Sequence, residues 1–371
     1  MRPTRAEIHV DHFLSNLKFV RKQIGERPRI MAIIKANAYG HGLDIIAHAA
    51  MRSEEIDAFG VATEEEGVRL RRMTSLPILV LTGTLFNEID EFLEHDLEFT
   101  LTDIKTLHAI GDRARALGKR ARVHLKVDTG MRRMGVEPEE ALPFLREIES
   151  LHEHVELVGL CTHFATSDEL DQTFFRRQLA MFEGVVREAK DAGIVIPIVH
   201  AANSGAILQA PKESAFDMVR PGMALYGYAP SMELQQRFAN DLQPPLALTS
   251  SIVFKKCVKK GEGVSYNLRW IAPRDTNIVT VPIGYGDGYP RLLTNRVNAI
   301  IRGKAYPVVG TICMDQILLD VGDDEVKVGD RIEFISPTSD GINAWTLAET
   351  IGTIPYEILT GIAARVPRVQ V

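Results

Sequence analysis

The chain has 371 residues, of which 45% are hydrophobic and 25% charged, and its formal net charge is −6. This composition is ordinary for a soluble globular protein, and the length predicts two domains. The acidic charge argues against nucleic acid or an anionic membrane surface as the main partner. Three widely spaced cysteines make no disulfide framework, and no apolar run approaches membrane-spanning length. We therefore expect a reduced, cytoplasmic protein that contains no metal site.

Short β-rich runs alternate with longer amphipathic segments through the first part of the chain. Eight such pairs in roughly 200 residues are typical of a (β/α)8 barrel. A doubly wound open sheet is the rival fold, but it usually has fewer strands and a glycine-rich first turn, which is missing here. The predicted strands are 30–35, 57–62, 77–82, 97–102, 122–128, 157–163, 195–201 and 216–220.

The pattern changes after about residue 243. Short alternating runs at 250–258, 277–285, 298–312 and 330–336 are separated by turns rich in glycine, proline and aspartate. This pattern predicts a mostly antiparallel β domain. We expect a barrel over residues 1–240 and a C-terminal β domain over residues 241–371.

Polar residues stand where the predicted barrel strands end. The working groups of such barrels sit at the C-terminal ends of the strands. Any one of these residues could be structural, but side chains from five strands converging on one mouth are hard to explain as packing. The residues are Lys35, Lys126, Asp128, His163, Asn203, Ser204 and Arg220.

Lys35 follows a run that reads as a buried strand. Burial disfavours a charged amine and lowers its pKa, so the neutral form can act as a nucleophile. Such a lysine can form a Schiff base with an aldehyde cofactor or a carbonyl substrate; a lysine whose ammonium simply reaches solvent at the barrel end is the alternative. Small residues at 204–205 and 221–222 follow the last two strands, where phosphate sites commonly form. A strand-end lysine beside a phosphate site indicates pyridoxal phosphate.

Motifs along nearly the whole chain resemble those of the bacterial alanine racemases, in the order of that family. They are IKANAYGHG (34–42), KVDTGMRRMG (126–135), THFATSDE (162–169), ANSGAIL (202–208), MVRPGMALYGYAPS (218–231), VSYN (264–267), IGYGDGYPR (283–291), ICMDQ (312–316), IPYE (354–357) and RVPRV (365–369). The resemblance implies a barrel followed by a β domain, in agreement with the pattern above. It also implies pyridoxal phosphate as the cofactor and a homodimer that interconverts L-alanine and D-alanine, supplying D-alanine for peptidoglycan.

The resemblance assigns roles to individual residues. Lys35 would carry the cofactor, Arg220 would face its pyridine nitrogen, and Arg133 would face its phenolic oxygen. Tyr266 of the neighbouring subunit would be the second base, with His163 behind it and Arg220 behind His163. The remaining cofactor contacts are implied for Tyr39, Asn203, Ser204, Gly222, Met223 and Tyr356.

The substrate side is implied by three residues. Met314 would hold the substrate carboxylate together with Arg133, and Tyr285 would stand at the entrance. Lys126 matches a lysine that is often carbamylated in the family, and an ordinary ion pair with Asp128 is the alternative.

The chain departs from the family motif at Arg132, which leaves open whether it or Arg133 meets the cofactor. Thr311 stands where the family commonly has arginine, and the residues after Tyr266 are also unusual. A broader small-amino-acid racemase, for example of serine, is an alternative. A barrel-type decarboxylase is disfavoured because Arg220 replaces an acid, and a non-enzymatic carrier is disfavoured because such carriers lack the second domain.

Overall fold

The computed structural model describes residues 2–338 and 341–371. Eight parallel strands form one sheet in the order β4-β3-β2-β9-β8-β7-β6-β5. The sheet closes between β4 and β5, where the Glu98 N–H donates to the Ile78 carbonyl at 2.8 Å and the Val80 N–H donates to the Glu98 carbonyl at 3.1 Å. The predicted (β/α)8 barrel is confirmed. Its strands are β2 (Arg29–Ile33), β3 (Ala58–Val61), β4 (Ile78–Val80), β5 (Phe99–Leu101), β6 (Ala121–Lys126), β7 (Val155–Cys161), β8 (Ile198–His200) and β9 (Met218–Val219).

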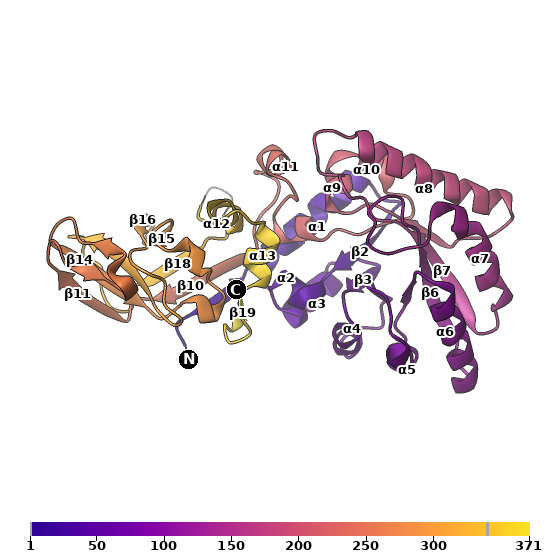
Figure 1. Cartoon of the computed structure of the whole chain (residues 1–371), viewed down its shortest axis with the longest axis horizontal. Coiled ribbons are helices and arrows are strands. Elements are labelled where there is room, and N and C mark those ends of the chain that lie inside the picture. The colour runs from indigo at the N-terminus through magenta and orange to yellow at the C-terminus, as the bar shows by residue number, and fades with distance from the viewer. Residues whose placement is uncertain (1, 339–340) are drawn as a thin grey trace.

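Amphipathic helices pack around this barrel (Figure 1). Phe175, Leu179 and Phe182 of α8 are buried at helical spacing, so this helix turns one apolar face to the strands. The side chain of Asp103 caps α6 by accepting the Thr106 N–H. The helices of this region are α1 (Val10–Ile24), α2 (Lys35–Tyr39), α3 (Leu43–Arg52), α4 (Glu64–Arg71), α5 (Ile89–Glu94), α6 (Ile104–Leu117), α7 (Ala141–Ser150), α8 (Thr173–Asp191), α9 (Ser204–Gln209) and α10 (Pro211–Ser214).

The second region lies at the other end of the molecule (Figure 1). A six-stranded sheet has the order β16-β15-β18-β10-β1-β19, and a three-stranded sheet has the order β11-β14-β17. Its strand pairs are antiparallel except for β1 with β19, in agreement with the predicted fold class. The elements are β10 (Leu246–Ser251), β11 (Phe254–Val258), β12 (Gly263–Val264), β13 (Trp270–Ile271), β14 (Thr276–Val281), β15 (Asn298–Ile301), β16 (Lys304–Pro307), β17 (Ile317–Gly322), β18 (Arg331–Ile335) and β19 (Arg368–Gln370), with helices α11 (Met232–Arg237), α12 (Ala344–Ile351) and α13 (Pro355–Thr360).

The first strand differs from the expected division of the chain. β1 (Arg5–Ile8) lies in the second sheet, where it pairs antiparallel with β10 and parallel with β19. Ala6 and Ile8 are fully buried there. A pattern of four residues does not predict pairing with strands more than 200 positions away. The sequence analysis therefore placed these residues in the barrel domain.

Candidate active site

A cavity of about 830 Å³ opens at the mouth of the barrel. Side chains that follow β2, β6, β7, β8 and β9 line it, so the strand-end residues meet in one place. Of the residues predicted to act in the site, the cavity is lined by Lys35, Tyr39, Lys126, Arg133, His163, Asn203, Ser204, Arg220, Gly222, Met223 and Tyr356.

Lys35 lies just beyond β2, which ends at Ile33 rather than at the lysine. The next residues form one turn of left-handed helix, with φ of 53°, 53°, 55° and 50° at Ala36, Asn37, Ala38 and Tyr39. Each non-glycine residue in this conformation costs roughly 1–2 kcal/mol. The surrounding structure holds the turn: Glu66 Oε1 accepts the Asn37 N–H, and Asn37 Oδ1 accepts the Leu43 N–H. The turn directs Lys35 and Tyr39 into the same cavity.

The charge state of Lys35 is shifted by its surroundings. Burial lowers the pKa of this amine from its ordinary value, and the nearby positive charge of Arg133 lowers it further. The neutral amine, which is the nucleophilic form, is therefore more accessible than in an exposed lysine. The direction of this shift suits a Schiff-base lysine, and that role of Lys35 stays a prediction.

The far end of the cavity is shaped for a compact anion. Ser204 Oγ accepts the N–H groups of Gly222 at 3.0 Å and Ala224 at 3.2 Å, which joins the loops after β8 and β9. A side chain at Gly222 would meet the Tyr39 hydroxyl at 2.6 Å, so only glycine leaves room for that ring. The rings of Tyr39 and Tyr356 lie 5.9 Å apart. Three hydroxyls around a glycine loop fit the phosphate of pyridoxal phosphate.

Asn203 lines the same end but uses its amide within the protein. Its Oδ1 accepts the Ala206 N–H and the Ser167 hydroxyl, and its Nδ2 donates to the Phe164 carbonyl. Asn203 therefore fixes the loop after β8 with its oxygen and one of its two amide N–H donors. Its cofactor contact stays a prediction.

Arg220 lies beneath the cavity and is held from several directions. Its Nη2 donates to the carbonyls of Thr162 at 2.7 Å and Ala201 at 3.0 Å, and lies 3.3 Å from His163 Nδ1. Burial, together with the positive charge of Arg220, keeps the pKa of His163 well below its ordinary value. His163 is therefore neutral, and its Nδ1 accepts from Arg220.

Lys126 lies near the positive charges of Arg133 and Arg220, which lower its pKa, and near Asp128, which raises it. Within the described residues no carboxylate lies at ion-pairing distance from its ammonium, because Asp128 Oδ1 instead accepts the N–H groups of Gly130 and Arg132. The expected alternative of a Lys126–Asp128 ion pair is therefore wrong. Burial, with the charges of Arg133 and Arg220, lowers the pKa of Lys126 to about 8.

The structure separates the two neighbouring arginines. Both are exposed in this chain, but Arg133 lines the cavity, whereas Arg132 pairs with Glu137 at 2.5 Å. Arg132 also adopts a φ of 56°, which turns the chain between them. Arg133 is therefore the arginine available to the site.

Three predicted residues lie outside this cavity, in the second region of the same chain. Tyr266, Tyr285 and Met314 are 68%, 41% and 53% exposed, and we call them the exposed patch. Their segments are hydrogen-bonded neighbours. The Tyr285 N–H donates to the Cys313 carbonyl, and the Thr311 hydroxyl donates to the Tyr266 carbonyl.

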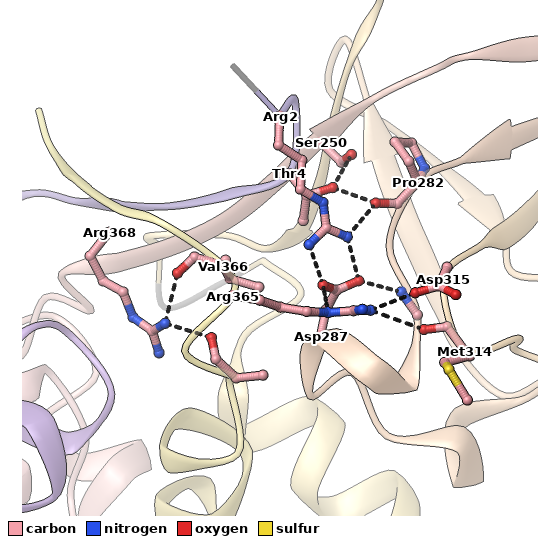
Figure 2. A network of polar contacts seen from close by, with 12 residues as sticks. Arg2, Thr4, Ser250, Pro282, Asp287, Met314, Asp315, Arg365, Val366 and Arg368 are labelled. Atoms are coloured by element: carbon pink, nitrogen blue, oxygen red, sulfur yellow. Dashed lines mark hydrogen bonds and ion pairs between the residues drawn. The ribbon is translucent and has the colours of Figure 1, made fainter.

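A buried carboxylate holds two segments of the exposed patch together (Figure 2). Asp287 accepts from Arg2 at 2.6 and 2.8 Å and from Arg365 at 2.7 Å. Arg365 also donates to Asp315 at 2.8 Å, next to Met314. These cations and the hydrogen bond from the Gly284 N–H outweigh burial and lower the pKa of Asp287. The loop that carries Tyr285 is thereby fixed to both ends of the chain.

Sequence reasoning missed two groups of residues. Asp287 stands inside a motif quoted for the resemblance, but nothing in the sequence points to Arg2 as its partner. His200 ends β8 and lines the cavity, so the strand-end rule that found His163 could also have found it.

Comparisons with known proteins agree with this site. The sequence matches the families "Alanine racemase, N-terminal domain" over residues 8–230 and "Alanine racemase, C-terminal domain" over residues 246–370. The alanine racemase of Symbiobacterium thermophilum is 41% identical over 371 residues, which covers 99% of this chain and 97% of that protein. The structure of the alanine racemase of Clostridium difficile 630 matches with a TM-score of 0.93 at 36% identity and covers 100% of this chain and 96% of its own.

A second solved structure contains the cofactor. Alanine racemase from Bartonella henselae with covalently bound pyridoxal phosphate matches with a TM-score of 0.88 at 26% identity, over 100% of both chains. The family matches together span both regions of the fold. The chain belongs to the alanine racemase family, the isomerases that interconvert L-alanine and D-alanine.

Proposed function

We propose that the barrel cavity binds pyridoxal phosphate covalently at Lys35 and that the racemisation takes place above it. The observation that carries this proposal is the meeting of Lys35, with its lowered pKa, and the hydroxyl and glycine cradle of Tyr39, Ser204 and Gly222 in one cavity. When bound, this cofactor withdraws electrons from the Cα–H bond of the attached amino acid.

Arg220 restrains that electron withdrawal. A proton on the ring nitrogen about 4 Å from a guanidinium would cost roughly 4 kcal/mol at an effective dielectric of about 20, or about three pK units. Arg220 would therefore keep a ring nitrogen beside it unprotonated, so that a proton removed from Cα would be replaced there quickly. This suits racemisation and disfavours side reactions.

Two bases on opposite faces would move the proton. Lys35 Nζ serves one face of Cα, and the phenol oxygen of Tyr266 of the partner subunit serves the other. The exposure of the patch and its absence from the cavity of its own chain support a homodimer with shared sites. In that dimer His163, whose Nδ1 accepts from Arg220, presents its Nε2–H for a hydrogen bond to the incoming phenol oxygen.

Arg133 and a modified Lys126 would complete the cofactor side. A lysine with a pKa near 8 has enough neutral amine to react with carbon dioxide, and the resulting carbamate would be an anion able to pair with Arg133. Met314 and Tyr285 of the partner subunit would approach the substrate carboxylate and the entrance.

We further propose that the enzyme works in the cytoplasm and supplies D-alanine for peptidoglycan. Within the described residues no helix has the length and apolarity needed to cross a bilayer.

Borohydride reduction followed by peptide mapping tests the assignment of Lys35. The purified protein with pyridoxal phosphate should be yellow, lose that absorption on reduction, and carry the label on Lys35. Lys35→Ala should bind the cofactor without becoming labelled. A reducible adduct on another lysine in that variant would contradict the proposal. The substrate is tested by chiral chromatography of L-alanine and L-serine after incubation with the enzyme, and faster turnover of serine would favour the broader alternative.

A further inference from the structure

Three buried polar side chains lie behind Arg220 and take no part in the proton transfers proposed above. Glu98 stands just before β5, His124 lies in β6, and His200 ends β8. All three are at most 1% exposed. Buried ionisable groups are costly unless they are hydrogen-bonded, so their contacts need an explanation.

These residues form one continuous chain of hydrogen bonds that leads to Arg220. His124 Nε2 lies 2.9 Å from Glu98 Oε2, and His124 Nδ1 lies 2.9 Å from His200 Nε2. His200 Nδ1 lies 2.8 Å from Arg220 Nη1. At the other end, Arg122 Nη2 lies 2.5 Å from Glu98 Oε1. The chain crosses the barrel from one arginine to another: the three links from Arg220 to Glu98 have hydrogen-bond geometry, and the contact between Glu98 and Arg122 is an ion pair.

A glycine makes the middle link possible. β7 lies between β6 and β8 in the sheet, so a side chain from β7 would normally separate His124 from His200. The residue at that point is Gly159, and a β-carbon there would collide with the His124 ring at Nδ1. The histidine rings instead meet edge to face, with centroids 5.0 Å apart. The barrel wall is thus shaped to bring these two rings together.

The chemistry of the end groups fixes the proton on each histidine. Arginine has donors only, so His200 Nδ1 must accept from Arg220, and the ring proton is on Nε2. That Nε2–H can only be accepted by an unprotonated His124 Nδ1, which places the His124 proton on Nε2, facing the Glu98 carboxylate. Both histidines are therefore neutral, and all the hydrogen bonds point from Arg220 toward Glu98.

The charges of the chain agree with this order. Burial and the charge of Arg220 keep the pKa of His200 well below its ordinary value. Burial raises the pKa of Glu98, but the hydrogen bond from His124 and the charges of Arg122 and Arg71 outweigh it and lower the pKa overall. A charged Glu98 can only accept from His124. The donor-to-acceptor order of all the hydrogen bonds from Arg220 to Glu98 is therefore fixed.

We propose that Glu98, His124 and His200 are positioning residues that hold the Arg220 guanidinium in the plane that faces the ring nitrogen of the cofactor. His200, kept as the Nε2–H tautomer, gives Arg220 an acceptor that neither rotates away nor becomes a donor. This inference rests on the proposed role of Arg220. Without this hydrogen-bond chain, Arg220 Nη1 would lose its neutral acceptor. The guanidinium could then rotate about the hydrogen bonds from Nη2 to the two carbonyls.

Nitrogen-15 NMR of the apoenzyme labelled at histidine tests the proton arrangement without cofactor. The His200 and His124 signals, assigned from the spectra of His200→Asn and His124→Gln, should show protonated Nε2 and unprotonated Nδ1. The His200 signals should remain so from pH 6 to pH 9. A proton on His200 Nδ1, or titration of His200 within that range, would overturn the proposal. This arm requires only the wild-type fold and the two assignments.

Substitution at His200 tests the positioning. His200→Leu removes the acceptor, and we expect the dissociation constant of the apoenzyme for pyridoxal phosphate to rise about tenfold and transamination to increase relative to racemisation. His200→Asn places an oxygen near the position of Nδ1 and should restore both quantities to within about threefold of wild type. His9→Leu is the matched control, because it removes a histidine outside this hydrogen-bond chain. It should leave the dissociation constant and the product ratio unchanged.

The outcomes separate this proposal from the proposed function. If His200→Leu folds with wild-type cofactor affinity and product ratio, the positioning role is wrong even when Lys35 carries the cofactor. If Lys35 is not labelled by borohydride, the proposed function fails, while the NMR arm still reports on the hydrogen-bond chain. If neither His200 variant folds, the His124 signals, assigned from His124→Gln, decide: a proton on Nε2 and none on Nδ1 supports the proposal, and a proton on Nδ1 overturns it.

Discussion

The guanidinium of Arg220 donates to Nδ1 of His163, so this contact determines which ring nitrogen of the histidine carries the proton. With Nδ1 occupied, the Nε2–H of His163 is left to face the cavity. A phenol oxygen that approaches from a partner subunit would meet a donor and not an acceptor. In the proposed site Arg220 would thus act twice, on the cofactor ring directly and on the second base through His163.

Arg220→Glu should reverse the first of these effects. A carboxylate beside the ring nitrogen stabilises a proton there and makes the cofactor a stronger electron acceptor. Racemisation should fall at least about tenfold, while transamination to pyruvate rises and a new long-wavelength absorption accumulates. Chiral chromatography and a pyruvate assay measure the two rates. A variant with the wild-type product ratio and spectrum would show that Arg220 does not act on the ring.

Mixing two inactive variants should restore activity if sites are shared. In a dimer of Lys35→Ala with Tyr266→Ala, one of the two sites regains both bases. Random exchange of equal amounts makes half of the dimers mixed, so about a quarter of the wild-type activity should return. Mixtures of each variant with itself are the controls. Mixed dimers, verified by mass spectrometry, that remain inactive would place Tyr266 within its own chain.

Lys126 should take up carbon dioxide, and more so at higher pH. The neutral amine is the reactive form, and with a pKa of about 8 its fraction rises as the pH is raised from 7 to 9. Carbon-13 NMR in labelled bicarbonate should show a carbamate signal that grows over this range. Lys126→Ala should lack it. A carbamate signal of equal size in wild type and Lys126→Ala would show that the carbamate forms on another amine.

Asp287→Asn should make the protein less sensitive to acid as well as less stable. The lowered pKa of Asp287 means that its stabilising contribution is present above the ordinary carboxyl value of 3.8 and is lost as the pH falls through the folded value. Urea unfolding should show a deficit of about 2 kcal/mol at pH 7 that shrinks toward pH 3. A deficit that is constant with pH would mean that charge is not what Asp287 contributes.

Ala36→Gly should stabilise the chain, although the same change weakens an ordinary helix. Ala36 is exposed and has a φ of 53°, so glycine relieves backbone strain without leaving a cavity. We expect a gain of about 1 kcal/mol in the free energy of unfolding. Ala114→Gly in α6, a helix with ordinary geometry, is the contrasting variant and should destabilise. A loss of stability in Ala36→Gly would contradict the strain argument.

The barrel could be predicted because each βα unit carries its own local pattern, and Lys35 and Arg220 could be found because strand ends define the mouth. What the sequence did not predict depends on long-range packing. The residues after Lys35 are small and turn-prone, and nothing in four such residues predicts a left-handed helix held by Glu66. The link between His124 and His200 depends on the space left by Gly159 in a third strand. Such contacts are properties of the closed barrel and not of any one segment.

The pairing of β1 with β10 and β19 has a consequence for how the chain is made. Residues 5–8 are synthesised before the barrel, yet both strands that pair with them, β10 and β19, follow the barrel in the chain. The barrel is, in topological terms, an insertion into the second domain. We infer that the barrel can close while β1 still lacks a partner, and that this sheet of the second domain is completed only after the barrel has been synthesised.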